Sequence, residues 1–388
     1  MNNIIKAVAM IWIVLFTVSS GILAWANEQP TAEQWCQRGD QCVKDRDYRS
    51  AIAAYSETIK INPADAGAYL KRGTVYYNAR DYDAALQDVE KTLELNHESA
   101  EAYFYRGHIY TQKGQYAQAI ADFDKAIALN SGMALWYASR GTAYYHKGDK
   151  ERALTDINKA IELDPGYAEA YFNRGKVFQD KRQFSQALSN YEKAIEFAPR
   201  DTRAYTNRGR IYEDMGQLDQ AQDDYTRAVL FDARNAIGFY NRGHVYQSKG
   251  QMDAALTDYS RALEINPRYS EAYKNRIAIY KSRGQLDQVL EDYNAIIELE
   301  PQRFVAYNDR GLIYQAKNQH QQALADFSSA LRLYPRYAPA YFNKAQSYLK
   351  IGSKAEALQA FKAFLQYAPP SDPGVYVARR WLKELDAQ

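Results

Sequence analysis

Asparagines recur at intervals of thirty-four residues, or twice that, from residue 173 onward. They are Asn173, Asn207, Asn241, Asn275 and Asn343, and Asp309 takes the one intervening place. An amide side chain carries both a hydrogen-bond donor and an acceptor, so it can pair with the backbone of any bound polypeptide. The row therefore predicts a peptide-binding surface, although asparagines that merely solvate a polar face would give the same pattern.

Apolar and basic side chains accompany this row in the sequence. Phe104, Phe172 and Tyr240 could receive the apolar side chains of a ligand. Lys176 and Arg210 could pair with acidic side chains of the same ligand. We predict that these five residues line one groove together with the asparagines.

A second row pairs opposite charges. An arginine also recurs with a period of thirty-four residues, and in seven of these units an aspartate follows it by sixteen residues, as in Arg72/Asp88, Arg106/Asp122, Arg208/Asp224 and Arg242/Asp258. The turn of a helical hairpin would lie midway between the two, so both side chains would reach the same level. We predict partly buried structural ion pairs, which the adjoining hairpin could share; a functional arginine ladder is the alternative.

Residue types that catalyse reactions or bind metals do not form a constellation in this sequence. The histidines are His97, His108, His146, His244 and His320, and none has a carboxylate or cysteine partner at ligand spacing. There is no phosphate-binding loop and no Gly-x-Ser-x-Gly motif. We therefore predict no enzyme activity, no catalytic residue, no metal and no cofactor.

The charge balance disfavours nucleic-acid binding. The formal net charge is +2, and without residues 1–26, which carry one lysine, 48 basic side chains face 47 acidic ones. A protein that binds phosphate backbones needs a basic excess that this chain lacks.

The elements that must position these side chains are helical hairpins. In the unit Phe239–Pro267, Phe239, Gly243 and Tyr246 recur one helical turn apart and share a face. Gly250 interrupts the pattern, a second helical run follows, and Pro267 ends it. The unit therefore predicts a helix–turn–helix of about thirty residues.

The same unit recurs ten times with a period of 34. Its glycine slot reads Gly39, Gly73, Gly107, Gly141, Gly175, Gly209, Gly243, Ile277, Gly311 and Ala345. The slot four residues earlier is aromatic in every unit. A 34-residue period with aromatic, Gly, Tyr, Ala and Pro at these offsets resembles the tetratricopeptide repeat.

The resemblance implies an all-α fold: a right-handed superhelical solenoid of helix–turn–helix repeats with a concave groove. We expect ten repeats over residues 32–371 and a C-terminal capping helix over residues 372–388, where Val375, Ala378, Leu382 and Leu385 share a face. In superhelical members of the family, asparagines at the place of Asn173, Asn207, Asn241 and Asn275 clasp an extended ligand.

One hairpin departs from the pattern. Its three small-residue slots hold Ile277, Val289 and Ile296. Larger side chains must push two close helices apart or fill a void. We predict a wider spacing of the two helices and a local change of superhelical pitch; a functional hinge is the alternative.

The N-terminal segment predicts export. Residues 1–26 combine one lysine, an apolar run and Ala24-Trp25-Ala26, which is the layout of a signal peptide cleaved before Asn27, and residues 27–31 form a linker. Residues 7–26 are also long enough for an uncleaved membrane anchor. Either arrangement places the repeats outside the cytoplasm, in a periplasm or another extracytoplasmic compartment, with an inner-membrane anchor as the alternative.

The only two cysteines, Cys36 and Cys42, fall in the first predicted helix. Six residues of helix separate them by about 9 Å, which is too far for a disulfide unless the helix is distorted. Cys42 would otherwise be a buried thiol in a tyrosine slot. Both possibilities follow from the sequence.

The sequence thus favours an exported, non-enzymatic scaffold that holds extended segments of partner proteins in its groove. A membrane-anchored structural or assembly subunit of an envelope complex is the first alternative. A hydrolase or envelope-modifying enzyme is the second.

Overall fold

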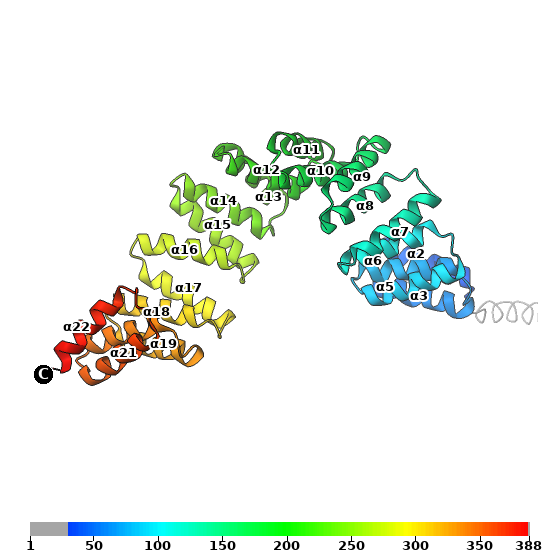
Figure 1. Cartoon of the computed structure of the whole chain (residues 1–388). Coiled ribbons are helices and arrows are strands. Elements are labelled where there is room, and N and C mark those ends of the chain that lie inside the picture. Colours follow the sequence, from blue (N-terminus) through cyan, green and yellow to red (C-terminus); the bar gives the residue numbers. More distant parts are fainter. Residues whose placement is uncertain (1–29, 387–388) are drawn as a thin grey trace, which may run out of the picture. The chain divides into compact units, whose positions relative to one another are not determined.

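The computed structural model describes residues 30–386, and the predicted signal or anchor segment lies outside them. Within the described residues, every regular element is an α-helix. No helix among them is long and apolar enough to cross a membrane. The chain divides into two units at Pro199/Arg200, and each unit is a row of helical hairpins (Figure 1).

The first unit holds five hairpins. Their helices are α2 (Ala32–Lys44), α3 (Tyr48–Ile61), α4 (Ala66–Asn78), α5 (Tyr82–Leu95), α6 (Ala100–Gln112), α7 (Tyr116–Leu129), α8 (Ala134–Lys147), α9 (Lys150–Leu163), α10 (Ala168–Asp180) and α11 (Phe184–Phe197). Each even-numbered helix is the first of its hairpin and packs along the odd-numbered helix that follows it.

The second unit holds five more hairpins and a final helix. The elements are α12 (Thr202–Asp214), α13 (Leu218–Phe231), α14 (Ala236–Ser248), α15 (Met252–Ile265), α16 (Ser270–Ser282), α17 (Leu286–Leu299), α18 (Phe304–Ala316), α19 (His320–Leu333), α20 (Ala338–Lys350), α21 (Lys354–Tyr367) and α22 (Gly374–Asp386). The predicted all-α fold of helix–turn–helix repeats is confirmed.

The turn inside each hairpin needs a residue with positive φ. Glycine supplies it at Gly114 and Gly250, with φ of 73° and 75°, because glycine has no Cβ to clash there. Arg80 and Arg182 hold the same conformation at 63° and 56°. A left-handed residue therefore ends the first helix even where the sequence lacks glycine.

The recurrent glycine inside each first helix permits close packing of the hairpin. A Cβ built on Gly107 would lie 2.7 Å from the ring of Phe123 on the partner helix. Ala119 and Ala126, which belong to the same buried cluster as that ring, are fully buried. Small residues thus let an aromatic ring of the second helix rest directly on the backbone of the first.

The hairpin α16/α17 is more open, as its larger side chains predict. The two helices approach each other less closely than in any other hairpin of residues 30–386. Ile277, Val289 and Ile296 are all buried in this hairpin, so the added side chains act as a wedge.

In seven hairpins the arginine row fastens the first helix to its own second helix through an aspartate. The four predicted pairs Arg72/Asp88, Arg106/Asp122, Arg208/Asp224 and Arg242/Asp258 are present with closest N–O distances of 2.7–2.8 Å. Three further pairs, Arg140/Asp156, Arg276/Asp292 and Arg310/Asp326, have the same form. Each aspartate of the predicted pairs accepts two hydrogen bonds from one guanidinium, which is the strong bidentate geometry.

The pairs are partly buried, as predicted, and their two members differ in depth. Asp88 and Asp122 are buried, with an exposed fraction of 5% each, and Asp224 and Asp258 are buried with 3% each. Only the arginine side chains keep partial exposure, at 17–23%. The offset of sixteen residues fixes the level of a pair in its hairpin but not its depth. A short aspartate stays between the helices, whereas a long arginine side chain reaches from there to the edge.

The same guanidinium groups also reach the preceding hairpin. Arg72 donates to Ser56 at 2.9 Å, and Arg140 donates to Asp124 at 2.6 Å. The bonds to Asp258 hold the pKa of Arg242 above its ordinary value, whereas burial raises the pKa of Asp224 in spite of its arginine. Arg72 and Arg140 therefore each join three helices: the two of their own hairpin and the second helix of the preceding one.

Helix α22 closes the C-terminal end of the second unit. It packs on α21, and its Ala378 is fully buried beside Phe361 and Phe364 of that helix. Val375 and Leu382 pack against the same cluster. The helix covers apolar surface that the last hairpin would otherwise expose, which is the role expected of a cap.

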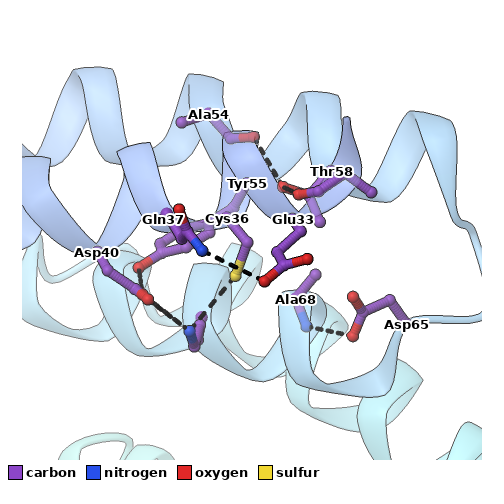
Figure 2. Close-up of polar contacts among 11 residues, drawn as sticks. Glu33, Cys36, Gln37, Asp40, Ala54, Tyr55, Thr58, Asp65 and Ala68 are labelled. Carbon is purple, nitrogen blue, oxygen red and sulfur yellow. Dashed lines mark hydrogen bonds and ion pairs between the residues drawn. The ribbon is translucent and has the colours of Figure 1, made fainter. Parts of the chain in front are cut away.

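The two cysteines are free thiols in an undistorted helix. Helix α2 runs through both of them, and no bridge joins Cys36 to Cys42. Cys42 packs against the cluster of Ala51, Tyr55 and Val75. Near Cys36, the carboxylate of Asp40 accepts a 2.7 Å hydrogen bond from the hydroxyl of Tyr55 (Figure 2).

Candidate functional site

The inner surface of each unit is formed by the first helices of its hairpins. In the first unit α4 contacts α6, α6 contacts α8, and α8 contacts α10; in the second, α12 contacts α14 and α18 contacts α20. The second helices of adjacent hairpins do not approach one another to the same extent within residues 30–386. We call the face of these first helices that carries the asparagine row the inner surface.

Hollows open along this inner surface in both units. In the first unit, one hollow of about 290 Å³ lies beside Leu70 and Tyr105, and another of about 200 Å³ is lined by Ser139 and Asn173. In the second unit, hollows of about 460 and 600 Å³ lie at α16 and at α18/α20. The two larger ones have the size of small-ligand pockets.

Three of the predicted asparagines already hydrogen-bond to their own chain. Asn173 donates to Thr142 at 3.4 Å, Asn275 donates to the hydroxyls of Tyr240 and Tyr259 at 3.3 Å, and Asn343 donates to Asn308 at 3.0 Å. Each bond joins neighbouring hairpins. These amides therefore take part in holding the array together.

Asn207 and Asn241 differ from the other three. Both are half-buried, and neither side-chain amide has a hydrogen-bond partner among the described residues. A half-buried amide without a partner is a group that a bound backbone can satisfy. The row thus divides into structural members and members whose bonding capacity is unused.

The prediction that Phe104 and Phe172 receive a ligand's side chains is wrong. Their exposed fractions are 7% and 6%, and each ring rests on the aromatic ring of its own second helix. Phe104 also stacks on Trp136 of the next hairpin at 5.6 Å. Their apolar surface is already used by the core, which the repeat period alone does not reveal.

The remaining predicted residues lie at the surface. Tyr240 is half-buried, with its ring 4.7 Å from that of Tyr269. The Lys176 ammonium lies 4.8 Å from the ring centre of Tyr145, which positions the lysine over an aromatic face. Arg210 is exposed and makes no ion pair with another described residue.

Three histidines on first helices have perturbed pKa values, and that of His146 is lowered by burial. Burial lowers the pKa of His108 to about 4, and its imidazole lies against Phe104 with ring centres 4.5 Å apart. The pKa of His244 is raised because Glu213 of the preceding hairpin forms a 2.5 Å hydrogen bond to Nδ1. Sequence reasoning missed these shifts. The signal that could have found the contact of His244 with Glu213 is their separation of thirty-one residues, close to one repeat.

No group of three or more His, Cys, Asp and Glu within residues 30–386 could hold a metal ion. His108 on α6 and His146 on α8, the first helices of neighbouring hairpins, have different partners. His108 lies 3.1 Å from the hydroxyl of Ser139, and His146 stacks on Tyr116. The two imidazoles therefore contact different neighbours.

Family models described as tetratricopeptide repeats match most of the chain. The matches cover residues 39–79, 70–134, 141–182, 168–201, 190–223, 209–250, 236–269 and 308–373. No curated protein sequence matches this chain.

Several solved structures have a similar fold. A human IFIT1 dimer with PPP-AAAA is 16% identical, with 78% of this chain and 73% of that chain covered and a TM-score of 0.52. YrrB, described as a TPR protein with an unusual peptide-binding site, is 26% identical over 48% of this chain and 97% of that chain, with a TM-score of 0.39. Yeast Tom70 is 17% identical over 92% and 96% of the two chains, with a TM-score of 0.37. Among these three, only the likeness to IFIT1 is informative, and it concerns the fold alone.

Proposed function

Because the chain belongs to the tetratricopeptide repeat family, we propose that it is a non-enzymatic scaffold that holds extended segments of partner proteins on its inner surface. The observation that carries this proposal is the unused amide pair Asn207 and Asn241 on consecutive first helices, α12 and α14, which contact each other. Two amides on adjacent helices can pair with successive peptide groups of one extended segment. Exposed Arg210 on α12 adds a cation for an acidic partner residue.

Affinity capture from an extract of the native cell envelope tests this proposal. The double variant N207A/N241A removes the amides that have no partner among the described residues, so we expect it to lose the captured partners. The matched control is N173A/N275A, which removes amides that bridge hairpins. We expect it to lower stability while partner capture at low temperature persists. Capture that survives N207A/N241A unchanged would contradict the proposal.

We propose in addition that the repeats act outside the cytoplasm. The support is the apolar run of residues 7–26 and the Ala24-Trp25-Ala26 motif before Asn27. N-terminal sequencing of the mature protein distinguishes the two arrangements that fit this segment. A chain that begins at Asn27 indicates a free exported scaffold, and an intact segment in the membrane fraction indicates a membrane-anchored assembly subunit. A mature chain recovered from the cytoplasm with residues 1–26 intact would contradict both.

A further inference from the structure

The pocket of about 460 Å³ in the eighth hairpin has the lining of an aromatic binding site. It lies between α16, α17 and the start of α18. Buried Ile277, Tyr293 and Ile296 supply its apolar wall. Asp309, which occupies a place in the asparagine row, also lines it, so the pocket opens on the inner surface.

In four other hairpins, an aromatic ring of the chain itself fills the corresponding place. The first-helix ring lies against the ring of the second helix with centres 5.7–5.9 Å apart in the pairs Phe104/Phe123, Phe172/Tyr191, Tyr240/Tyr259 and Phe342/Phe361. The eighth hairpin retains the second-helix ring as Tyr293. Its first-helix position is Lys274, the only charged residue among the ten in this slot. Tyr293 therefore lacks the ring that Phe123, Tyr191, Tyr259 and Phe361 have.

The third hairpin shows what occupies this volume when the rings are present. There the ring of Phe104 and the imidazole of His108 lie together against Phe123, at 5.9 and 5.4 Å. The places of these two residues in the eighth hairpin are taken by Lys274 and Ala278, which both line the pocket. Two rings are thus replaced by a flexible amine and a methyl group.

The larger side chains of α16 and α17 enlarge the same space. Ile277 stands where eight other hairpins have glycine, and Ile296 of α17 lines the pocket with it. Their bulk holds the helices apart, so the missing rings are not compensated by collapse of the hairpin. The pocket therefore results from the absence of two rings, at Lys274 and Ala278, and from the larger side chains that separate the helices.

The charges at the rim favour an acidic neighbour of the inserted ring. Lys274, Lys281 and Arg303 line the pocket against Glu271 and Asp309. Lys281 donates to the hydroxyl of Tyr293 at 3.2 Å, and Arg303 pairs with Glu300. Lys274 is exposed and has no ion-pair partner among the described residues. An anion on the ligand would supply that partner.

We propose that this pocket receives one aromatic side chain of a partner segment, stacked against Tyr293, with an acidic residue beside it paired to Lys274. The inserted ring takes the place that Phe104 or Phe342 takes in its own hairpin. The inference rests on the proposed peptide-binding function and specifies the partner residue that the second unit selects. Buried aromatic side chains dominate the energetics of such contacts.

The test uses the full-length protein and a probe of fixed composition. N-acetyl-aspartyl-5-fluorotryptophan amide is titrated while its fluorine NMR signal is followed. The variant K274F restores the ring found in other hairpins, so we expect at least a tenfold loss of affinity together with a raised melting temperature. A second probe has lysine in place of the aspartyl residue. The variant K274Q keeps the space open, so we expect it to bind both probes with similar affinity, whereas the wild type prefers the aspartyl probe.

Equal binding by the wild type and K274F would overturn the proposal, as would absence of binding to the wild type. Neither result would touch the scaffold function, which depends on partner capture by Asn207 and Asn241. The double variant N207A/N241A should bind the fluorinated dipeptide as the wild type does. Loss of dipeptide binding in that variant would also contradict an isolated pocket at Lys274.

Discussion

At the scale of single residues, an arginine secures a polar contact inside seven of the hairpins. Its guanidinium donates to an aspartate of its own hairpin and, at Arg72 and Arg140, to the second helix of the preceding one. The aspartates are almost completely buried; Asp258 is 3% exposed. A buried carboxylate is tolerated only with such a bidentate partner.

Replacing one member of a buried pair should therefore be costly. We expect D258A to lower the free energy of unfolding of the second unit by about 3 kcal/mol, because it leaves the Arg242 guanidinium partly buried without its main acceptor. The measurement is urea unfolding followed by circular dichroism. The control is R261A, which breaks the exposed pair with Glu264 and should cost less than about 1 kcal/mol. Equal losses would mean that burial does not decide the strength of these pairs.

His108 should make the first unit sensitive to acid. Its pKa is lowered to about 4, whereas an unfolded histidine titrates near 6.5, so the unfolded chain binds the extra proton first. The stabilisation is complete above about pH 6.5 and is lost as the pH falls towards 4, by up to about 3 kcal/mol. We expect H108Q to flatten this part of the pH profile of unfolding. The variant H97Q, at an exposed histidine, is the control, and an unchanged profile in H108Q would refute the assignment.

At the scale of the helical hairpin, spacing is governed by a few small residues. Gly107 allows Phe123 to rest on the backbone of α6, and Ala119 and Ala126 of α7 share the tight interface. In α16/α17 the corresponding residues are larger and the helices separate. Helix spacing, and with it the presence of a pocket, is therefore set locally in each hairpin.

A single methyl group should be enough to disturb a tight hairpin. G107A places a Cβ 2.7 Å from the ring of Phe123, so the helices must shift, and we expect a loss of about 1–3 kcal/mol in spite of the better helix propensity of alanine. G132A is the control, because the nearest atom to its Cβ would be 3.5 Å away. The measurement is the melting temperature of each variant by calorimetry, which should fall in G107A and stay close to that of the wild type in G132A. Greater stability in G107A would show that the hairpin can repack freely.

At the scale of the whole molecule, stability is shared between neighbouring hairpins. A hairpin of two short helices cannot offset its own conformational entropy, so each one depends on the next. The terminal hairpin α20/α21 has a neighbour on one side and α22 on the other. The cap therefore controls the local stability of that end.

Removal of the cap should have an effect that fades along the array. A chain ending at Ser371 exposes Phe361 and Phe364, so we expect faster amide hydrogen exchange in α20 and α21 and little change in α12 and α13. Hydrogen exchange with mass spectrometry resolves the helices separately. Uniformly faster exchange throughout the second unit would indicate all-or-none folding instead of nearest-neighbour coupling.

Much of the fold followed from the repeat itself. The period placed the helices, the turns between them and the Arg/Asp pairs, because each depends on contacts within one hairpin or on a fixed offset to the next. The wedge of Ile277, Val289 and Ile296 was visible for the same reason. The depth of Asp88 and Asp122 was not, because burial depends on how closely the neighbouring helices cover each carboxylate.

The binding surface depended on contacts that spacing does not encode. Asn241 and Asn275 occupy the same slot, yet Asn275 is bonded to two tyrosines while Asn241 has no partner in the described residues. Phe104 and Lys274 likewise share a slot, and one is core while the other borders an open pocket. Sequence by itself determined the repeated hairpin, since its hydrophobic pattern has one low-energy arrangement. Only the tertiary structure decided which polar and aromatic groups remain available, because that depends on the volume and hydrogen-bonding capacity of side chains from neighbouring helices.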